Sequence, residues 1–100
     1  MYGTTMIATM KGDRAAIERE LTAWVAVRAP EVPGFVDAQL LFADDGRTVV
    51  NTVRFASRED YQRLADDPRQ DEWYSERMLP LIDGEARWID GDWFEPSAGD

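Results

Sequence analysis

Residues 35–55, FVDAQLLFADDGRTVVNTVRF, contain two segments of strand-forming residues on either side of the turn signal Asp44-Asp45-Gly46. Phe35–Ala43 and Thr48–Phe55 are therefore predicted to form an antiparallel hairpin. Successive side chains of a strand point to opposite faces. One face of the second strand then consists of Val49, Asn51, Val53 and Phe55, and the other of Val50, Thr52 and Arg54.

Asn51 is the only polar residue in the apolar row of this strand. A buried carboxamide that lacks hydrogen-bond partners costs about 1–3 kcal/mol. Asn51 would therefore either bond to a neighbouring backbone group at a bulge or hold a polar ligand in an apolar pocket. The sequence leaves both interpretations open.

The rest of the chain alternates further strands and helices. Strands are predicted at Thr4–Met10 and Glu85–Phe94, and helices from the N-cap Asp13 to about Arg28, from the N-cap Ser57 to Ala65, and over Arg69–Leu79, closed by Pro80 and Gly84. This order predicts a ferredoxin-like α+β fold, an antiparallel sheet with helices on one face. We expect one domain over residues 1–100, with a core at about 4–94 and a flexible tail at 95–100.

Helical spacing assigns the apolar residues of the first two helices to the sheet side. The inner faces would consist of Ile17, Leu21, Trp24 and Val25, and of Tyr61, Leu64 and Ala65. The other face of the sheet would carry Val50, Thr52, Val36, Leu40 and Phe42. That set is too apolar to face water, so a homodimer that packs two sheets together is expected.

Composition excludes several classes of function. The chain has no Cys and no His, which rules out zinc fingers, iron–sulfur sites, thiol catalysis, His-dependent triads and His-ligated haem. Its net charge of −9 opposes binding to nucleic acid or anionic membranes, and favours a small or neutral partner. No apolar run reaches the roughly 20 residues of a membrane span, and the N-terminal residues lack a signal peptide pattern, so a cytoplasmic location is expected.

Several short motifs together resemble the antibiotic biosynthesis monooxygenase family, and most of all its small anthrone-oxidising members. They are Glu31-Val32-Pro33-Gly34-Phe35, Asp45-Gly46, Val49-Val50-Asn51, and Ser57 through Tyr61, within a resemblance that covers about residues 4–94. The most specific feature is Val-Val-Asn followed at a fixed distance by Tyr. The resemblance implies a dimeric α+β barrel with a pocket between sheet and helices in each subunit. It also implies oxidation of a phenolic tricycle by molecular oxygen, without metal, flavin or haem.

Carried over by position, Asn51 and Tyr61 correspond to the pocket asparagine and tyrosine of the family. Two positions differ from the family pattern. Phe55 stands where the family has a tryptophan, and Tyr74 stands at or near the family's arginine, with Arg77 as the nearest replacement. The expected substrate-binding residues are Phe55, Trp73, Tyr74 and Arg77.

The expected chemistry begins with loss of a proton from an anthrone to give an enolate, which passes one electron to oxygen. Radical recombination gives a hydroperoxide, and loss of water gives a quinone. Asn51 and Tyr61 would donate hydrogen bonds to the developing oxyanion, or Tyr61 would relay the proton. Tyr61 as an ordinary core residue is the simpler alternative. Other functions compatible with the fold are binding of a small aromatic molecule without turnover, a stress-related role, and cyclisation of a polyketide intermediate.

Other conspicuous residues receive structural interpretations. Trp73 and Tyr74 are adjacent on a helix, so only one of them is expected to line a pocket. Trp24, Trp88 and Trp93 are expected to pack in the core or the dimer interface. Arg54 would pair with an acid across the dimer, and Asp90 and Asp92 would form a solvated strand edge rather than a carboxylate pair for acid–base work.

Overall fold

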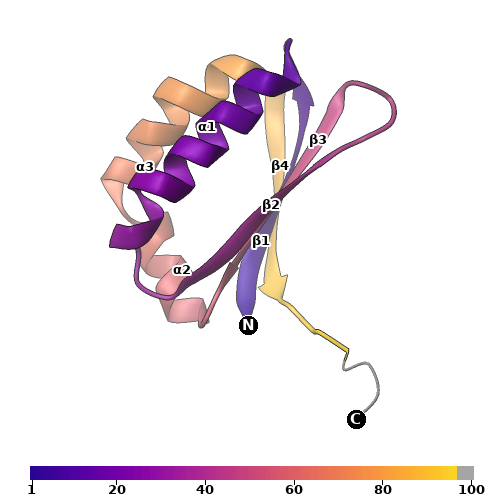
Figure 1. Cartoon of the computed structure of the whole chain (residues 1–100). Helices are drawn as coiled ribbons and strands as arrows, with labels where there is room; N and C mark the ends of the chain where they lie inside the picture. Colours follow the sequence, from indigo (N-terminus) through magenta and orange to yellow (C-terminus); the bar gives the residue numbers. More distant parts are fainter. Residues whose placement is uncertain (97–100) are drawn as a thin grey trace.

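A computed structural model describes residues 1–96 of the chain, and Figure 1 shows its two layers. Four strands form one sheet, and the helices cover a single face of it. The elements are β1 (Tyr2–Met10), α1 (Arg14–Val27), η1 (Ala29–Glu31), β2 (Phe35–Phe42), β3 (Thr48–Phe55), α2 (Arg58–Ala65), α3 (Pro68–Trp73), η2 (Tyr74–Met78), η3 (Leu79–Leu81) and β4 (Ile82–Asp92).

The strands are antiparallel and lie in the order β2-β3-β1-β4. The predicted ferredoxin-like α+β architecture is confirmed, because the first and last strands of the chain pair at the centre and edge of the sheet. In Figure 1, α1 and α3 lie next to each other across the sheet, and α2 lies below them. The face opposite the helices is not covered by any element of the described chain.

Side-chain caps explain where the helices begin. Asp13 accepts a hydrogen bond from the Ala15 backbone N–H at 2.9 Å, which satisfies one of the free donors at the start of α1. Ser57 accepts from the Asp60 N–H, and its hydroxyl donates to the Asp60 carboxylate at 2.9 Å. Both predicted N-caps are confirmed.

The β2–β3 turn is held by one carboxylate. Asp45 accepts hydrogen bonds from the backbone N–H groups of Arg47 and Thr48, both at 2.8 Å, and from the Thr48 hydroxyl at 2.7 Å. The backbone donors of Thr48 and then Arg47 lower the pKa of Asp45 to about 2. Gly46 next to it has a φ of 72°, in the left-handed region that an L side chain rarely adopts. The predicted hairpin is confirmed.

A bulge at Val36 changes which residues of β2 face the helices. Phe35 pairs with Phe55, but the next pair is Asp37 with Arg54, so one extra residue lies in β2. The prediction that Leu40 and Phe42 lie on the outer face is therefore wrong, because the inserted residue inverts the alternation. Both pack against the core, and Leu41, 64% exposed, takes the outer position.

The third helix and the last strand also differ from prediction. The helix expected over Arg69–Leu79 is α-helical only to Trp73 and continues as the π-helical turn η2. β4 begins at Ile82 rather than Glu85. Gly84 does not close a helix but lies within β4 with a φ of 74°, where the β1–β4 register shifts. Glycine tolerates this backbone conformation, so the strand absorbs the extra residues as a bulge.

Two clusters of buried side chains form the core. Met6, Ile17, Val49 and Met78 belong to one cluster, and Trp24, Val32 and Phe55 to the other. Val25 and Ala65 were expected on inner faces but are exposed, so these two predictions are wrong. The reason is that each helix contacts the sheet through a narrow stripe, and these residues lie just outside it.

On the outer face, Arg54 pairs within its own chain. Its Nε donates to Asp37 Oδ1 at 2.8 Å, and its guanidinium also contacts Glu95. The expected pairing of Arg54 across a dimer is therefore not needed to satisfy its charge. Residues 97–100 of the predicted tail lie outside the described residues. Within residues 1–96, none of the helices has the length and apolar character needed to cross a membrane.

Candidate functional site

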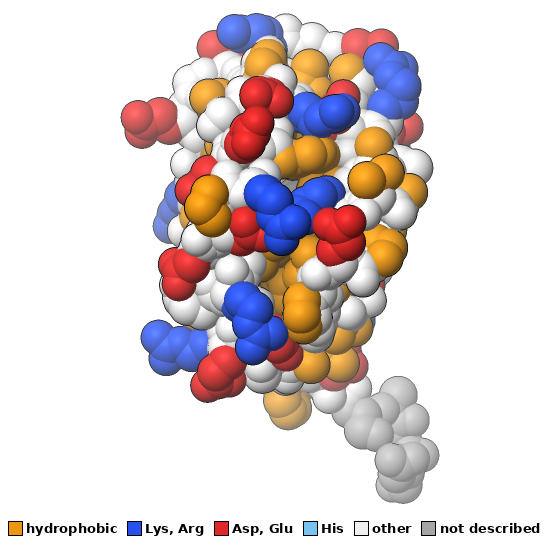
Figure 2. All heavy atoms as spheres, turned by 90° about the vertical axis from the view of Figure 1, so that its left-hand side faces the viewer, with side chains coloured by type: hydrophobic (Ala, Val, Ile, Leu, Met, Phe, Trp, Pro, Cys, Tyr) orange, Lys and Arg blue, Asp and Glu red, His pale blue; other side chains and the backbone are white. Residues whose placement is uncertain are grey.

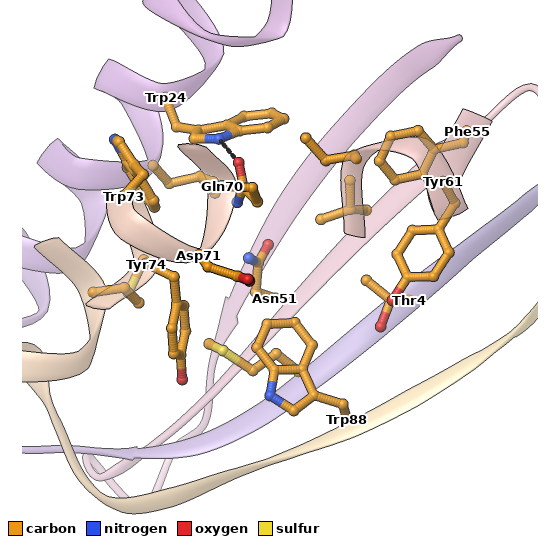
Figure 3. Close-up of a pocket in the computed structure, with 15 residues that line it drawn as sticks. Thr4, Trp24, Asn51, Phe55, Tyr61, Gln70, Asp71, Trp73, Tyr74 and Trp88 are labelled. Atoms are coloured by element: carbon orange, nitrogen blue, oxygen red, sulfur yellow. Dashed lines mark hydrogen bonds between the residues drawn. The ribbon is translucent and has the colours of Figure 1, made fainter. Parts of the chain in front are cut away.

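A cavity of about 330 Å³ lies between the sheet and the helices (Figure 3), within the size range of small-molecule sites. Figure 2 shows the helix side of the molecule, where hydrophobic side chains are visible in a groove between charged ones. The cavity is lined by Thr4, Met6, Leu21, Trp24, Asn51, Val53, Phe55, Tyr61, Leu64, Gln70, Asp71, Trp73, Tyr74, Met78 and Trp88.

Asn51 lies on the floor of this cavity. It is 9% exposed, and Figure 3 shows its amide pointing from β3 toward Gln70 and Asp71 of α3. β3 is regular here, because Asn51 pairs with Met6 of β1 and Leu40 of β2 without a register shift. The interpretation of Asn51 as a bulge-bonding residue is therefore wrong.

The amide oxygen of Asn51 is buried and has no hydrogen-bond partner among residues 1–96. Buried polar atoms are nearly always paired, so an orphaned one in a cavity calls for a specific explanation. Rotation of the carboxamide exchanges its oxygen and nitrogen, so either end can face a bound molecule. Asn51 therefore offers an unused polar group to a ligand within an apolar surround.

Gln70 supplies a second amide, whose orientation is fixed. The indole Nε1–H of Trp24 donates to Gln70 Oε1 at 2.9 Å. Because the oxygen is occupied, the Gln70 NH2 group is left to donate elsewhere, and in Figure 3 it lies on the side of Gln70 that faces Asn51. Two amides from different elements thus converge on one part of the cavity.

Aromatic side chains form most of the remaining wall. Phe55 is fully buried and contacts Tyr61, with ring centroids 5.4 Å apart. Trp24 and Trp73 meet edge to face at 6.5 Å, and Tyr74 and Trp88 at 5.6 Å. Rings in these tilted and edge-on arrangements present flat apolar surface from several directions. The cavity therefore suits a flat aromatic molecule.

The hydroxyl of Tyr61 is not free. It donates to Asp90 Oδ1 of β4 at 2.9 Å, and the Thr4 hydroxyl donates to the same oxygen at 2.6 Å. Burial, and then the hydrogen bond to the Asp90 carboxylate, raise the pKa of Tyr61 to about 12. Tyr61 is therefore a neutral phenol at physiological pH, and its proton points away from the cavity toward Asp90.

The structure brings together most of the residues predicted from the sequence. Asn51, Phe55, Tyr61, Trp73 and Tyr74 all line the cavity. Arg77 lies outside this lining, half exposed, with its Nη1 3.5 Å from Glu20 Oε2 of α1.

One expectation about the aromatic residues is wrong. Trp73 and Tyr74 both line the cavity, and they lie where α3 ends and the π-helical turn η2 begins, which changes the spacing of side chains around the helix. Trp24 is a core residue as expected, and both Trp24 and Trp88 also border the cavity. Asp90 is more than a solvated edge residue, since two hydroxyl groups donate to it.

The sequence reasoning missed Thr4, Gln70 and Asp71 as lining residues. Gln70 and Asp71 precede Trp73 by three and two residues, so the i, i+3 spacing to Trp73 was a signal available for Gln70 but not for Asp71. The contact of Thr4 with Asp90 required the β1–β4 register, which pairs these two residues directly. Within residues 1–96, no group of three acidic, His or Cys side chains is arranged to hold a metal ion.

Comparisons with known proteins show which class of fold this is. No family model matches the sequence, and no curated protein sequence matches it. Solved structures match over nearly the whole chain. One is a ferredoxin-like protein of the dabb family from Mesorhizobium loti, with a TM-score of 0.68, 17% identity, and 94% of this chain and 97% of that chain covered. The chain thus has the ferredoxin-like α+β fold.

Two further structures belong to oxygenases. SnoaB from Streptomyces nogalater, a cofactor-independent oxygenase, matches with a TM-score of 0.73 and 21% identity, covering 96% of this chain and 97% of that one. The ActVA-Orf6 monooxygenase of Streptomyces coelicolor, solved with the ligand nanaomycin D, matches with a TM-score of 0.73 and 21% identity, covering 99% and 92%. The chain is similar to both in its fold.

Proposed function

We propose that this protein is a cofactor-independent monooxygenase that oxidises an anthrone-type polycyclic aromatic to a quinone with molecular oxygen. The observation that carries the proposal is the buried Asn51 amide, orphaned inside a cavity walled by aromatic rings. The fold shared with two oxygenases, one described as cofactor-independent, supports it. The resemblance of the sequence motifs supports the same activity.

The reaction balances without a cofactor. The anthrone loses a proton and becomes an enolate, which gives one electron to oxygen to form a carbon radical and superoxide. These recombine and take up a proton to give a hydroperoxide, which loses water to leave the quinone. The protein has to favour the enolate, orient it and exclude water.

Amide donors would stabilise the enolate in this cavity. None of the described lining residues is Lys or Arg, so no fixed cation faces the substrate. The Asn51 and Gln70 amides converge on one part of the cavity instead, and Trp24 holds Gln70 in the donating orientation. Oriented donors in a site shielded from water stabilise developing negative charge strongly. Phe55 and Trp73, with Tyr74 and Trp88, would hold the rings.

Oxygen uptake with a simple anthrone tests the proposal. Chelator-treated protein is compared with its Asn51→Ala variant, and products are identified by mass spectrometry. We expect metal-independent uptake and a quinone product, with turnover reduced about 10²–10³-fold in the variant, as for loss of one oxyanion donor. No uptake by the parent protein above the spontaneous rate refutes the oxygenase.

Binding without turnover is a second candidate, and the absence of Lys and Arg from the described cavity lining favours it. In that case an anthrone or quinone would quench the fluorescence of Trp73 and Trp88 on binding and be recovered unchanged. Recovery of a quinone from the bound anthrone would exclude this candidate. A polyketide cyclase would instead release a ring-closed product without consuming oxygen.

We also propose that the protein is a homodimer that packs the outer faces of two sheets together. The bulge at Val36 turns Leu40 and Phe42 toward the core and Leu41 outward, so that face still carries an exposed apolar side chain from β2. Leu41 and Ile89 are each more than a third exposed, and the strand register places both on the face opposite the helices. Single exposed apolar residues are ordinary, but apolar residues exposed on a sheet face that no helix covers favour a partner surface.

A further inference from the structure

Tyr61 connects the cavity to a carboxylate outside it. The Tyr61 ring lines the cavity, whereas Asp90 lies beyond the lining, on the exposed edge strand β4. Figure 3 shows Tyr61 beside Thr4 at one end of the cavity, with its hydroxyl next to the Thr4 side chain. The hydrogen bond from Tyr61 to Asp90 therefore crosses from the substrate cavity to a side chain in contact with solvent.

Asp90 is held in this position from two directions. Thr4 is 5% exposed, and its hydroxyl donates to the same Asp90 oxygen that accepts from Tyr61. Thr4 and Asp90 are also direct partners in the β1–β4 ladder, so the backbone fixes their separation. Both donors use Oδ1, and the exposed carboxylate can exchange protons with water.

A neutral phenol cannot by itself act as the base that removes a proton from carbon, because its oxygen is already protonated. It can accept one only while giving its own proton to another base. At the pH of the cell Tyr61 remains a phenol, since burial and the Asp90 carboxylate raise its pKa to about 12. The carboxylate that accepts its hydrogen bond is the base positioned to receive that proton.

We propose that Asp90 is the terminal proton acceptor for enolate formation, with Tyr61 as the relay and Thr4 as the residue that positions Asp90. This inference rests on the proposed function. The substrate proton moves from carbon to Tyr61 Oη while the Tyr61 proton moves to Asp90 Oδ1. The C–H electron pair stays on the substrate as the enolate, Tyr61 ends as it began, and Asp90 releases the proton to water.

Two other carboxylates provide the comparison. Asp71 lines the cavity and would take a proton directly, without a relay. Asp92 lies two residues beyond Asp90 on β4, where its partner in β1 is Tyr2 rather than Thr4. Asp71 is exposed as well, but among residues 1–96 Asp90 is the exposed carboxylate that accepts hydrogen bonds from lining hydroxyl groups, those of Thr4 and Tyr61. Asp71→Asn therefore tests the rival base, and Asp92→Asn is the matched control for loss of charge on the same strand.

Exchange of the substrate proton under anaerobic conditions isolates this step from oxidation. An anthrone is incubated with protein in D2O without oxygen, and loss of its methylene proton signal is followed by NMR. Oxygen uptake is measured separately, and thermal unfolding confirms that each variant is folded. The variants are Asp90→Asn, which keeps the shape and an acceptor oxygen for Tyr61, and Asp90→Ala with added formate, which enters the space left by the carboxylate.

We expect Asp90→Asn to slow exchange about 10²-fold, in the range of general-base catalysis. Formate should restore much of the exchange rate of Asp90→Ala, while Asp92→Asn keeps the parent rate. Retention of more than a third of the parent exchange rate by Asp90→Asn would overturn the relay. Loss of exchange in Asp71→Asn, with exchange kept in Asp90→Asn, would also overturn it.

The two proposals fail in different ways. Oxygen uptake by the parent protein with unimpaired exchange in Asp90→Asn leaves the oxygenase standing and removes the relay. Absence of both uptake and catalysed exchange in the parent protein removes the oxygenase, and the relay with it.

Discussion

Replacement of Asn51 by leucine should stabilise the protein while abolishing its activity. The Asn51 amide oxygen is buried without a partner among the described residues, which costs about 1–3 kcal/mol relative to an apolar side chain of similar shape. The extra volume of leucine can enter the cavity, so overpacking is avoided. We expect Asn51→Leu to raise the free energy of unfolding by about 1–2 kcal/mol, and Tm by roughly 4–16 °C for a chain of this size.

Urea denaturation followed by tryptophan fluorescence, at one fixed protein concentration, measures this change. Asn51→Asp is the matched control, because it keeps the shape but places a charge in the same apolar surround and should destabilise the fold at neutral pH. If Asn51→Leu instead lowers the free energy of unfolding by 1 kcal/mol or more, the amide makes a stabilising contact. The Asn51 amide would then serve the stability of the fold and would not be kept for a ligand.

Three further predictions concern the scaffold. Gly34→Ala should lower the free energy of unfolding by more than about 1 kcal/mol, because the residue has a φ of 80° and the new methyl group would lie 2.1 Å from the Asp60 carboxylate; urea denaturation checks this. The folded-state pKa of Asp45 is depressed, so its stabilising effect is present above the unfolded pKa, about 3.9, and is lost as pH falls toward 2. Thermal unfolding of Asp45→Asn should therefore lack that part of the acid dependence, and an unchanged pH profile would contradict the assignment. Leu41→Lys should convert the proposed dimer to a folded monomer in analytical ultracentrifugation, whereas a dimer that persists would exclude this face as the interface.

The hairpin and the pocket floor could be predicted because their signals are local. Alternation in β3 placed Asn51 on the helix side, and Asp45 with Gly46 marked the turn. The outer face of β2 could not be predicted in the same way. One inserted residue at Val36 inverts the alternation, and only pairing with β3 reveals the insertion. The alternation of apolar and polar residues along a strand does not show where a bulge shifts that alternation by one residue.

Contacts between the ends of the chain were beyond prediction for a related reason. Thr4 and Asp90 are separated by 86 positions, and their hydrogen bond depends on the register of β1 against β4. Trp24 and Gln70 meet across 46 positions, through the packing of α1 against α3. From the sequence, Asp90 was expected at a solvated strand edge and Trp24 in the core or the dimer interface. Their roles arise from partners that the tertiary structure supplies.

The described cavity lining contains no Lys or Arg, so catalysis here requires that fixed dipoles stabilise the charge of the enolate. A guanidinium would stabilise an anion over a wide range of positions, whereas amides act only where their N–H groups point. Gln70 meets this condition because Trp24 occupies its oxygen, so the orientation of its NH2 group is set before a ligand arrives. Donors that need no reorganisation contribute most where water is excluded. The indole of Trp24, which the sequence suggested was packing alone, would then orient the second of the two amides that face the substrate.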